Sequence, residues 1–132
     1  MRRLQRKVKA LNERDAVNKK FQKELNSGTT ALVLLSVLSR TSEPMYGYQI
    51  AKQIGADGGD VPMVKQGALY PVLRSLENGG LLRSHVEPSV SGPPRRYYNI
   101  TEAGSQTLER WMEIWQKTKS FVDNTLKGSC NA

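Results

Sequence analysis

The stretch GALYPVLRSLENGG, Gly67–Gly80, constrains the fold most, because it marks both ends of one helix. Its apolar side chains recur at helical spacing, at Leu69, Val72, Leu73 and Leu76. The two closing glycines are typical of a helix end. A proline inside a helix costs roughly 3 kcal/mol, but little in the first turn, where its missing N–H has no partner to lose. Pro71 therefore predicts a helix that begins near residues 65–68 and buries the four apolar side chains.

Further helices and one pair of strands are predicted around this stretch. The predicted helices span residues 1–26, 31–39, 46–54, 65–78 and 101–127, and the predicted strands span residues 81–87 and 95–100. Ser27 to Thr30 can end the first helix and cap the second, Gly55 lies near the stop of the third, and Thr101 can cap the last.

Three helices followed by a two-stranded hairpin are typical of the winged helix-turn-helix, in which one helix enters the major groove of DNA. We therefore expect a mainly α fold with a small β-hairpin, a winged helix-turn-helix with an added N-terminal helix and a C-terminal dimerisation helix. In chain order we expect a basic N-terminal helical arm at 1–28, the DNA-binding domain at 29–100, the dimerisation helix at 101–127 and a tail at 128–132.

The arm carries most of the charge. Residues 1–26 hold nine of the 20 Lys and Arg and three of the 12 Asp and Glu, so they contribute +6 of the net +8. Such an excess favours a polyanionic partner. The arm also carries an apolar stripe, which we expect to pack on the domain or on a second subunit through Leu11, Val17, Phe21 and Leu25. Its Arg2 to Lys9 end would then meet DNA phosphates; the alternative is a solvated positive face.

The residue counts exclude several function classes. The chain has one histidine, His85, and one cysteine, Cys130, with no second ligand or nucleophile partner at a useful spacing. We therefore expect no catalytic residue, no metal site and no cofactor. A lone cysteine forms no internal disulfide, and no apolar run approaches the roughly 20 residues of a membrane span. We expect a cytoplasmic protein with no membrane partner and no signal peptide.

Three motifs, MYGYQI, GALYPVLRSLENGGLL and GPPRRYYNITEAG, occur in this order between Met45 and Gly104. Together they resemble the PadR family of bacterial transcriptional regulators. The resemblance implies a homodimer whose winged-helix domains bind a palindromic operator and whose C-terminal helices form most of the interface. Family members commonly carry Ser-Pro-Gly-Thr where this chain has Lys65 to Ala68, so a relative's operator does not transfer.

The predicted recognition helix and wing supply most of the residues expected to contact DNA. Nine residues are predicted to do so: Tyr46, Tyr48, Lys65, Gln66, Ala68, Tyr70, Arg74, Arg95 and Arg96. Helix N-terminal amides suit a phosphate, a glutamine can pair with adenine and an alanine can touch a thymine methyl group. Tyrosine hydroxyls also suit phosphates.

Two of these expectations involve a choice between neighbours. At least one of Tyr46 and Tyr48 is expected in the core. Strand alternation sends Arg95 and Arg96 to opposite faces, so we expect one to face DNA and the other to pair with an acid such as Glu87.

The last predicted helix carries an aromatic surface too large to leave in water. We expect a dimer interface formed by Leu108, Trp111, Met112, Trp115 and Val122. In some members of the family that the chain resembles, tryptophans on this helix bind flat hydrophobic compounds, so a small hydrophobic effector is the alternative for these residues.

Taken together, the motifs and the charge favour a sequence-specific DNA-binding transcriptional regulator. We expect a repressor that binds double-stranded DNA at a pseudo-palindromic operator as a homodimer, through a recognition helix and a wing. The alternative is a winged-helix protein-interaction module that has lost DNA binding.

Overall fold

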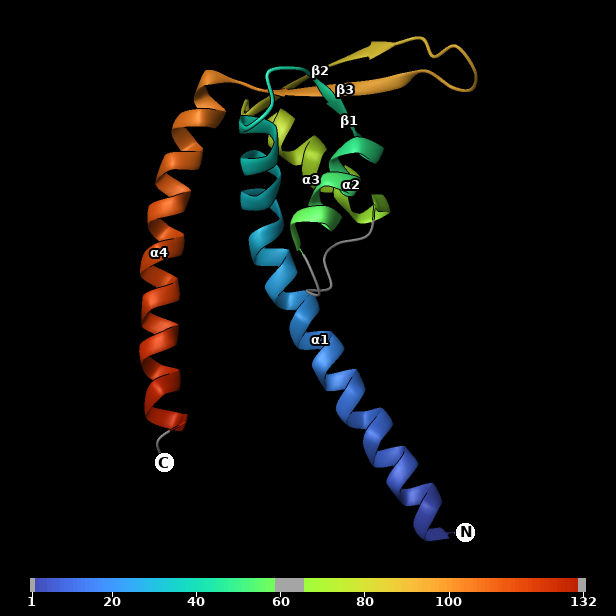
Figure 1. Cartoon of the computed structure of the whole chain (residues 1–132), viewed down its shortest axis with the longest axis vertical. Coiled ribbons are helices and arrows are strands. Elements are labelled where there is room, and N and C mark those ends of the chain that lie inside the picture. Colours follow the sequence, from blue (N-terminus) through green and yellow to red (C-terminus); the bar gives the residue numbers. More distant parts are fainter. Residues whose placement is uncertain (1, 59–65, 131–132) are drawn as a thin grey trace.

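The structure is a computed structural model that describes residues 2–58 and 66–130 (Figure 1). The elements in chain order are α1 (Arg2–Ser39), β1 (Met45–Tyr46), α2 (Gly47–Gly58), α3 (Gln66–Asn78), β2 (Leu82–Glu87), β3 (Arg95–Ile100) and α4 (Glu102–Cys130). The described elements confirm the mainly α fold with a small β-hairpin, and they add a third strand.

The first element, α1, is one continuous helix where two were predicted. The predicted break at Ser27 to Thr30 is wrong because the threonine hydroxyls are satisfied inside the helix. Thr29 Oγ1 donates to the carbonyl oxygen of Leu25 at 2.9 Å. Thr30 Oγ1 donates in the same way to the carbonyl oxygen of Asn26. Gly28 costs a helix only about 1 kcal/mol relative to alanine, which is not enough to end it.

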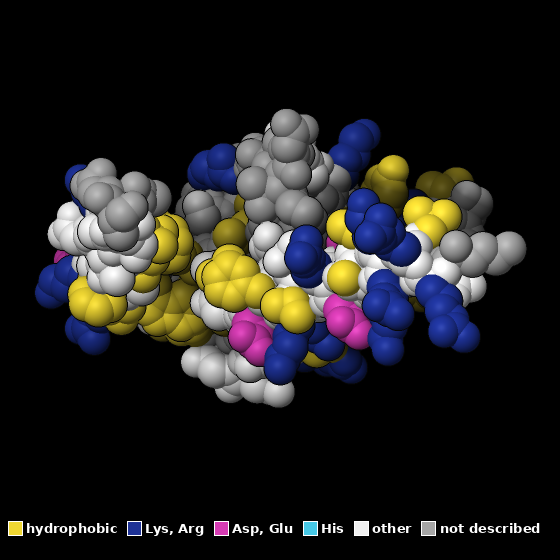
Figure 2. All heavy atoms as spheres, turned by 90° about the horizontal axis from the view of Figure 1, so that it is seen from below, with side chains coloured by type: hydrophobic (Ala, Val, Ile, Leu, Met, Phe, Trp, Pro, Cys, Tyr) yellow, Lys and Arg dark blue, Asp and Glu magenta, His cyan; other side chains and the backbone are white. Residues whose placement is uncertain are grey.

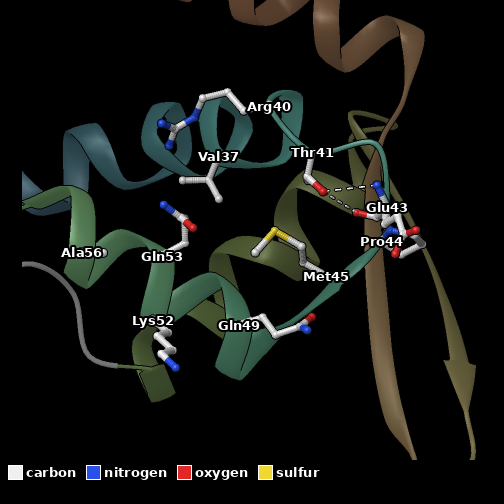
Figure 3. A pocket seen from close by; sticks show the side chains of 10 residues that line it. All are labelled: Val37, Arg40, Thr41, Glu43, Pro44, Met45, Gln49, Lys52, Gln53 and Ala56. Carbon is white, nitrogen blue, oxygen red and sulfur yellow. Dashed lines mark hydrogen bonds between the residues drawn. The ribbon is translucent and has the colours of Figure 1, made fainter.

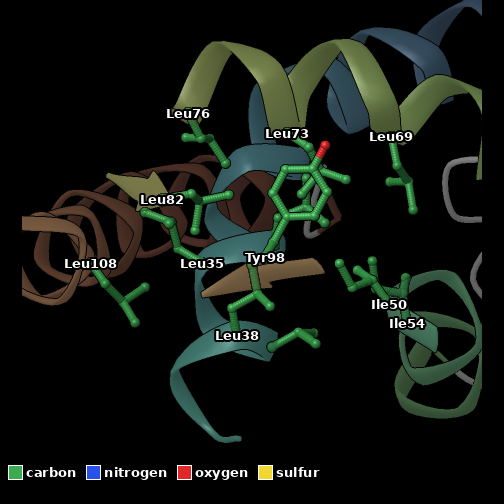
Figure 4. Close-up of a cluster of buried hydrophobic side chains, with 12 residues drawn as sticks. Leu35, Leu38, Ile50, Ile54, Leu69, Leu73, Leu76, Leu82, Tyr98 and Leu108 are labelled. Carbon is green, nitrogen blue, oxygen red and sulfur yellow. The ribbon is translucent and has the colours of Figure 1, made fainter. Parts of the chain in front are cut away.

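The hydrophobic core lies where the C-terminal part of α1 meets α2, α3, the sheet and the first turns of α4 (Figure 4). Its buried residues are Leu34, Leu35, Val37, Leu38, Ile50, Ile54, Leu69, Leu73, Leu76, Leu82, Tyr98 and Leu108. The predicted core face of α3 is confirmed, although Val72 is only half-buried. This packing fixes α3 with its opposite face exposed.

The end of α3 is a Schellman motif, as the paired glycines predict. Gly80 has φ of 79°, and its N–H donates to the carbonyl oxygen of Glu77 at 2.9 Å. The N–H of Leu81 donates to the carbonyl oxygen of Leu76, also at 2.9 Å. Both leucines pack in or against the core, so the turn that leads into the wing is held by hydrogen bonds and by apolar contact.

The structure describes α3 from Gln66, within the predicted start at residues 65–68. Pro71 is then its sixth residue and lies beyond the first turn where it was expected, so α3 lacks the hydrogen bond to the carbonyl of Gly67. Leu69 and Leu73 are almost fully buried, and burial of each leucine contributes roughly 1.5–3 kcal/mol. Core packing on both sides of the proline therefore offsets its cost.

The sheet has the order β1-β3-β2, with both pairs antiparallel. Leu82 lies opposite Ile100 at the base of the predicted hairpin. The two-residue strand β1 was not predicted, because two residues are too few to show an alternating pattern. Tyr46 pairs with Tyr97 in this strand, so the helix predicted from residue 46 begins one residue later and runs past Gly55.

A tight joint leads from β3 into α4. Thr101 Oγ1 accepts a hydrogen bond from the N–H of Gly104 at 3.0 Å, which confirms the predicted N-cap, and donates to the carbonyl oxygen of Gly80 at 2.7 Å. A Cβ on Gly104 would lie 2.1 Å from the carbonyl oxygen of Leu81. The first turn of α4 thus lies directly on the turn that follows α3.

Candidate nucleic-acid interface

One groove joins β1, the start of α2, the exposed side of α3 and the wing formed by β2 and β3. Its volume is about 550 Å³, and its lining residues are Tyr46, Gly47, Tyr48, Tyr70, Arg74, Ser91, Pro93, Pro94, Arg95, Arg96 and Tyr98. Six of the nine residues predicted to contact DNA are among them. Within the described part of the chain, the lining includes three arginines and no acidic residue, so the groove suits an anion.

Tyr70 crosses from α3 to the start of α2, and Gly47 provides the space for it. A Cβ on Gly47 would lie 2.6 Å from the hydroxyl oxygen of Tyr70 and 2.7 Å from its Cε1. The ring therefore lies against the backbone of α2, and 39% of the residue is still exposed. This contact places the Tyr70 hydroxyl at the groove before any ligand binds.

Arg95 is placed by an aromatic ring. Its guanidinium carbon lies 4.5 Å from the centre of the Tyr46 ring, within the range of a cation–π interaction. The Tyr46 ring also contacts those of Tyr48 and Tyr97, with centroids 6.3 Å and 5.4 Å away. The expectation that Tyr46 or Tyr48 belongs to the core is wrong: Tyr46 is half-buried and Tyr48 is 54% exposed. The two rings are held at the surface by contact with other aromatic rings and not by burial in the core.

Arg96 lies on the opposite face of β3 and is tied to α3 through a hydroxyl. Its Nη1 donates to Ser84 Oγ at 2.9 Å, and Ser84 Oγ donates to the carboxylate of Glu77. The predicted pairing of a wing arginine with Glu87 is wrong, because that carboxylate contacts His85 Nε2 at 3.0 Å. The network from Arg96 to Glu77 links the wing to the helix beside it.

Tyr98 also lines the groove, although only 3% of the residue is exposed. Burial, and secondarily the negative charge of Glu77, raise the pKa of the Tyr98 phenol above its ordinary value of 10.0, while Arg96 and Arg74 act in the opposite direction. The phenol therefore stays neutral at physiological pH and can donate a hydrogen bond.

The remaining predicted DNA contacts lie at the start of α3. Ala68 is exposed there, in the turn before Tyr70. Gln66 is the first residue of the helix, but its side chain lies outside the described part of the structure, as does the whole of Lys65.

Comparison with known protein families supports the same part of the chain as the candidate DNA interface. The model of the transcriptional regulator PadR-like family matches residues 34–110, which include α2, α3 and the wing. The chain belongs to the PadR-like family of transcriptional regulators. It is thus a DNA-binding regulator and not an enzyme. No curated protein sequence gave a match.

Several solved structures of transcriptional regulators share this arrangement. A PadR family transcriptional regulator from Eggerthella lenta is 32% identical, with a TM-score of 0.70, and the match covers 86% of this chain and 96% of that one. A transcriptional regulator from Clostridium thermocellum is 27% identical, with a TM-score of 0.67 and coverage of 76% and 93%. A PadR-like regulator from Bacillus cereus is 28% identical, with a TM-score of 0.63 and coverage of 78% and 96%.

This PadR-like chain also has an apolar cavity between α1 and α4, apart from the groove beside α3. A cavity of about 450 Å³ there is lined by Glu24, Leu25, Gly28, Thr29, Ala31, Leu32, Trp111, Ile114, Trp115 and Thr118. Trp111 also packs against the core, and Leu108 is buried inside it, so Leu108 is not available to a partner. Met112 and Val122 are 54% and 43% exposed.

A third hollow, of about 660 Å³, lies between the end of α1, the segment before β1 and α2 (Figure 3). It is larger than the groove beside α3, but its cationic residues Arg40 and Lys52 share it with Glu43. None of the nine residues predicted to contact DNA lines it. The groove of Tyr70 and the arginines is therefore the candidate interface.

Some residues of the groove were not predicted. Gly47 lies between two predicted tyrosines in MYGYQI, and a glycine in that position is a signal for a close approach. Tyr98 carried no comparable signal. Within residues 2–58 and 66–130, no cluster of His, Cys, Asp and Glu could hold a metal ion, and no helix is both long and apolar enough to cross a membrane.

Proposed function

We propose that this protein is a repressor that binds a pseudo-palindromic operator as a homodimer. The exposed side of α3 enters the major groove, and the wing meets the adjoining DNA. The observation that carries this proposal is the groove in which Tyr70 and Arg74 from α3 lie beside Arg95 and Arg96 from the wing. Arginines and tyrosine hydroxyls are the groups that bind phosphates, and an arginine can also read guanine.

The dimer is supported by apolar surface that one chain leaves uncovered. On α4 the exposed residues are Met112, Ile114, Trp115, Phe121, Val122 and Leu126. On α1 they are Leu4, Val8, Leu11, Val17, Phe21 and Leu25. Figure 2 shows hydrophobic side chains on the facing sides of these two helices. Binding to a pseudo-palindrome would then require a two-fold axis that holds two copies of α3 about 34 Å apart, one turn of DNA.

The cavity between α1 and α4 could also bind a small hydrophobic effector. The cavity between α1 and α4 is mostly apolar, and two tryptophans line it beside Leu25 and Leu32. A flat apolar compound bound there would contact both helices of the proposed interface. It could therefore alter the spacing of the two recognition helices, and with it the affinity for the operator.

The test is to select duplexes from a randomised 30-base-pair pool with the full-length protein. The affinity of the protein for the selected duplexes is then measured at several salt concentrations. We expect enriched sequences with two inverted half-sites whose centres are about 10 base pairs apart. The affinity should fall steeply with salt. A pool that stays random would refute the proposal and favour a winged-helix module that docks on proteins.

A further inference from the structure

The loop at the end of the wing, Pro88–Pro94, is held in one shape by a single hydroxyl group. We call it the wing tip. Ser89 Oγ lies 3.1 Å from the carbonyl oxygen of Ser91 and 2.9 Å from those of Gly92 and Pro93. Gly92 has φ of 100°, in the left-handed region that glycine adopts without strain. The side chain of Ser89 thus lies inside the turn, and the residue after it points outward.

That residue is Val90, which is fully exposed, with a relative accessible area of 109%. The wing tip contains no charged residue, although Arg95 and Arg96 follow it directly. A tip without a cation gains nothing from neutralising phosphates. It instead presents a stiff β-branched apolar side chain on a turn whose shape is already set. A single exposed valine is ordinary, but one held at the end of a DNA-binding hairpin is in a position to touch bases.

We propose that Val90 enters the minor groove of the operator and selects A·T base pairs there, an inference that rests on the DNA-binding function proposed above. The hairpin of β2 and β3 extends beyond the helical body (Figure 1). With α3 in the major groove, the wing tip at its end would reach the adjoining groove of the duplex. Arg95 and Arg96 begin β3 directly after the wing tip and line the groove beside α3. In the proposed complex they bind the phosphates between the two grooves.

The chemistry of the minor groove explains the selection. Its floor carries only the acceptors of adenine N3 and thymine O2 at A·T pairs, whereas G·C pairs add the projecting N2 amino group of guanine. The two methyl groups of Val90 fit over the flat A·T floor and collide with that amino group. A·T tracts are also narrower, which brings the sugar walls into contact with the same methyl groups. Valine is shorter than the side chains that unstack base steps, so it selects by fit and not by kinking.

The experiment uses a duplex selected from the randomised pool by the wild-type protein. Each A·T pair outside the half-sites is replaced in turn by G·C, by inosine·C, which lacks the minor-groove amino group, and by 2,6-diaminopurine·T, which adds one. At the pair under the wing tip we expect the affinity of the wild type to fall about five- to tenfold with G·C and with diaminopurine·T. The affinity should recover with inosine·C, because the minor groove of that pair resembles A·T although its major groove still resembles G·C.

The variant Val90→Ala should bind all four duplexes within about twofold of one another, because the methyl groups that sense the amino group are gone. Its salt dependence should equal that of the wild type, since no charge is removed. Val86→Ala is the matched control. It makes the same substitution at a valine on the stem of the hairpin that is 51% exposed. It should keep the full preference of the wild type.

Two outcomes would overturn the inference while leaving DNA binding intact. In one, the wild type is indifferent to the amino group at every position tested. In the other, Val90→Ala retains the wild-type preference. If the wild type enriches no duplex at all, the proposed function itself fails, and the inference fails with it.

Discussion

At the scale of single residues, the wing arginines are held by their neighbours before DNA binds. Arg95 lies over the Tyr46 ring, and Arg96 is bonded through Ser84 to Glu77. Both arginines have thus lost part of their rotamer freedom, which reduces the entropy cost of binding. Strand alternation predicted their opposite faces. It could not predict these partners, because Tyr46 is about fifty residues away in the sequence and reaches Arg95 only through the unpredicted strand β1.

The first prediction concerns how Tyr46 acts. If its ring positions Arg95, Tyr46→Phe should bind duplex DNA like the wild type, and Tyr46→Leu should lose about 0.5–2 kcal/mol of binding free energy. In an Arg95→Ala background, Tyr46→Leu should cause little further loss. Fluorescence anisotropy on the selected duplex measures the wild type, the three single variants and the double variant. Equal losses in Tyr46→Phe and Tyr46→Leu would show that the hydroxyl itself holds a phosphate, as the sequence first suggested.

At the scale of elements, predictions failed where a local signal was outweighed by packing or by length. The end of α3 was predictable because Gly79-Gly80 satisfies a local geometry. The continuity of α1 was not predictable, because its threonine hydroxyls can cap a new helix or bond within a continuous one. The residues that follow them pack against α2 and α3 as part of the same helix. The residue types that line the groove were predictable from the sequence. Its shape was not, because it depends on the close approach of the Tyr70 ring to Gly47.

The second prediction concerns the joint between β3 and α4. In Gly104→Ala the new Cβ meets the backbone of Leu81, which cannot move without breaking the turn after α3. We expect a loss of at least about 2 kcal/mol in the free energy of unfolding. Gly55→Ala is the control, since a Cβ there meets nothing within 4 Å in the middle of α2, and it should stabilise by about 0.5–1 kcal/mol.

Urea unfolding at one fixed protein concentration measures both variants, because the stability of a dimer depends on concentration. If Gly104→Ala were as stable as the wild type, α4 would have to start elsewhere than on the turn after α3.

At the scale of the whole molecule, α1 and α4 separate beyond the core and leave their apolar faces uncovered (Figures 1 and 2). The third prediction is that Met112→Asp with Val122→Asp converts a dimer into a folded monomer. Both side chains are exposed in the single chain, so the core is untouched. Sedimentation velocity should show about half the wild-type mass with unchanged helicity. Gln106→Asp with Asn124→Asp makes the same charge change at exposed residues on the other side of α4, and should remain dimeric. A dimeric Met112→Asp, Val122→Asp variant would place the interface elsewhere.

The last prediction concerns the basic arm. As part of α1 it is a straight continuation of a 38-residue helix, about 57 Å long, and its N-terminal end is far from the sheet (Figure 1). Residues 2–9 hold five basic side chains and no acidic one. A rigid helix holds these charges at a fixed distance from the groove, where they can meet phosphates outside the half-sites and no bases.

Deletion of residues 1–9 should therefore weaken binding to the selected duplex and to random DNA equally, and should leave the sequence preference intact. Each lost phosphate contact lowers the magnitude of the log-log salt slope by about 0.9. Replacing the same cations with glutamine keeps Leu4 and Val8 and separates charge from packing. If the deletion leaves the slope unchanged but weakens the dimer, the arm serves the other subunit through its apolar stripe and has no electrostatic role on DNA.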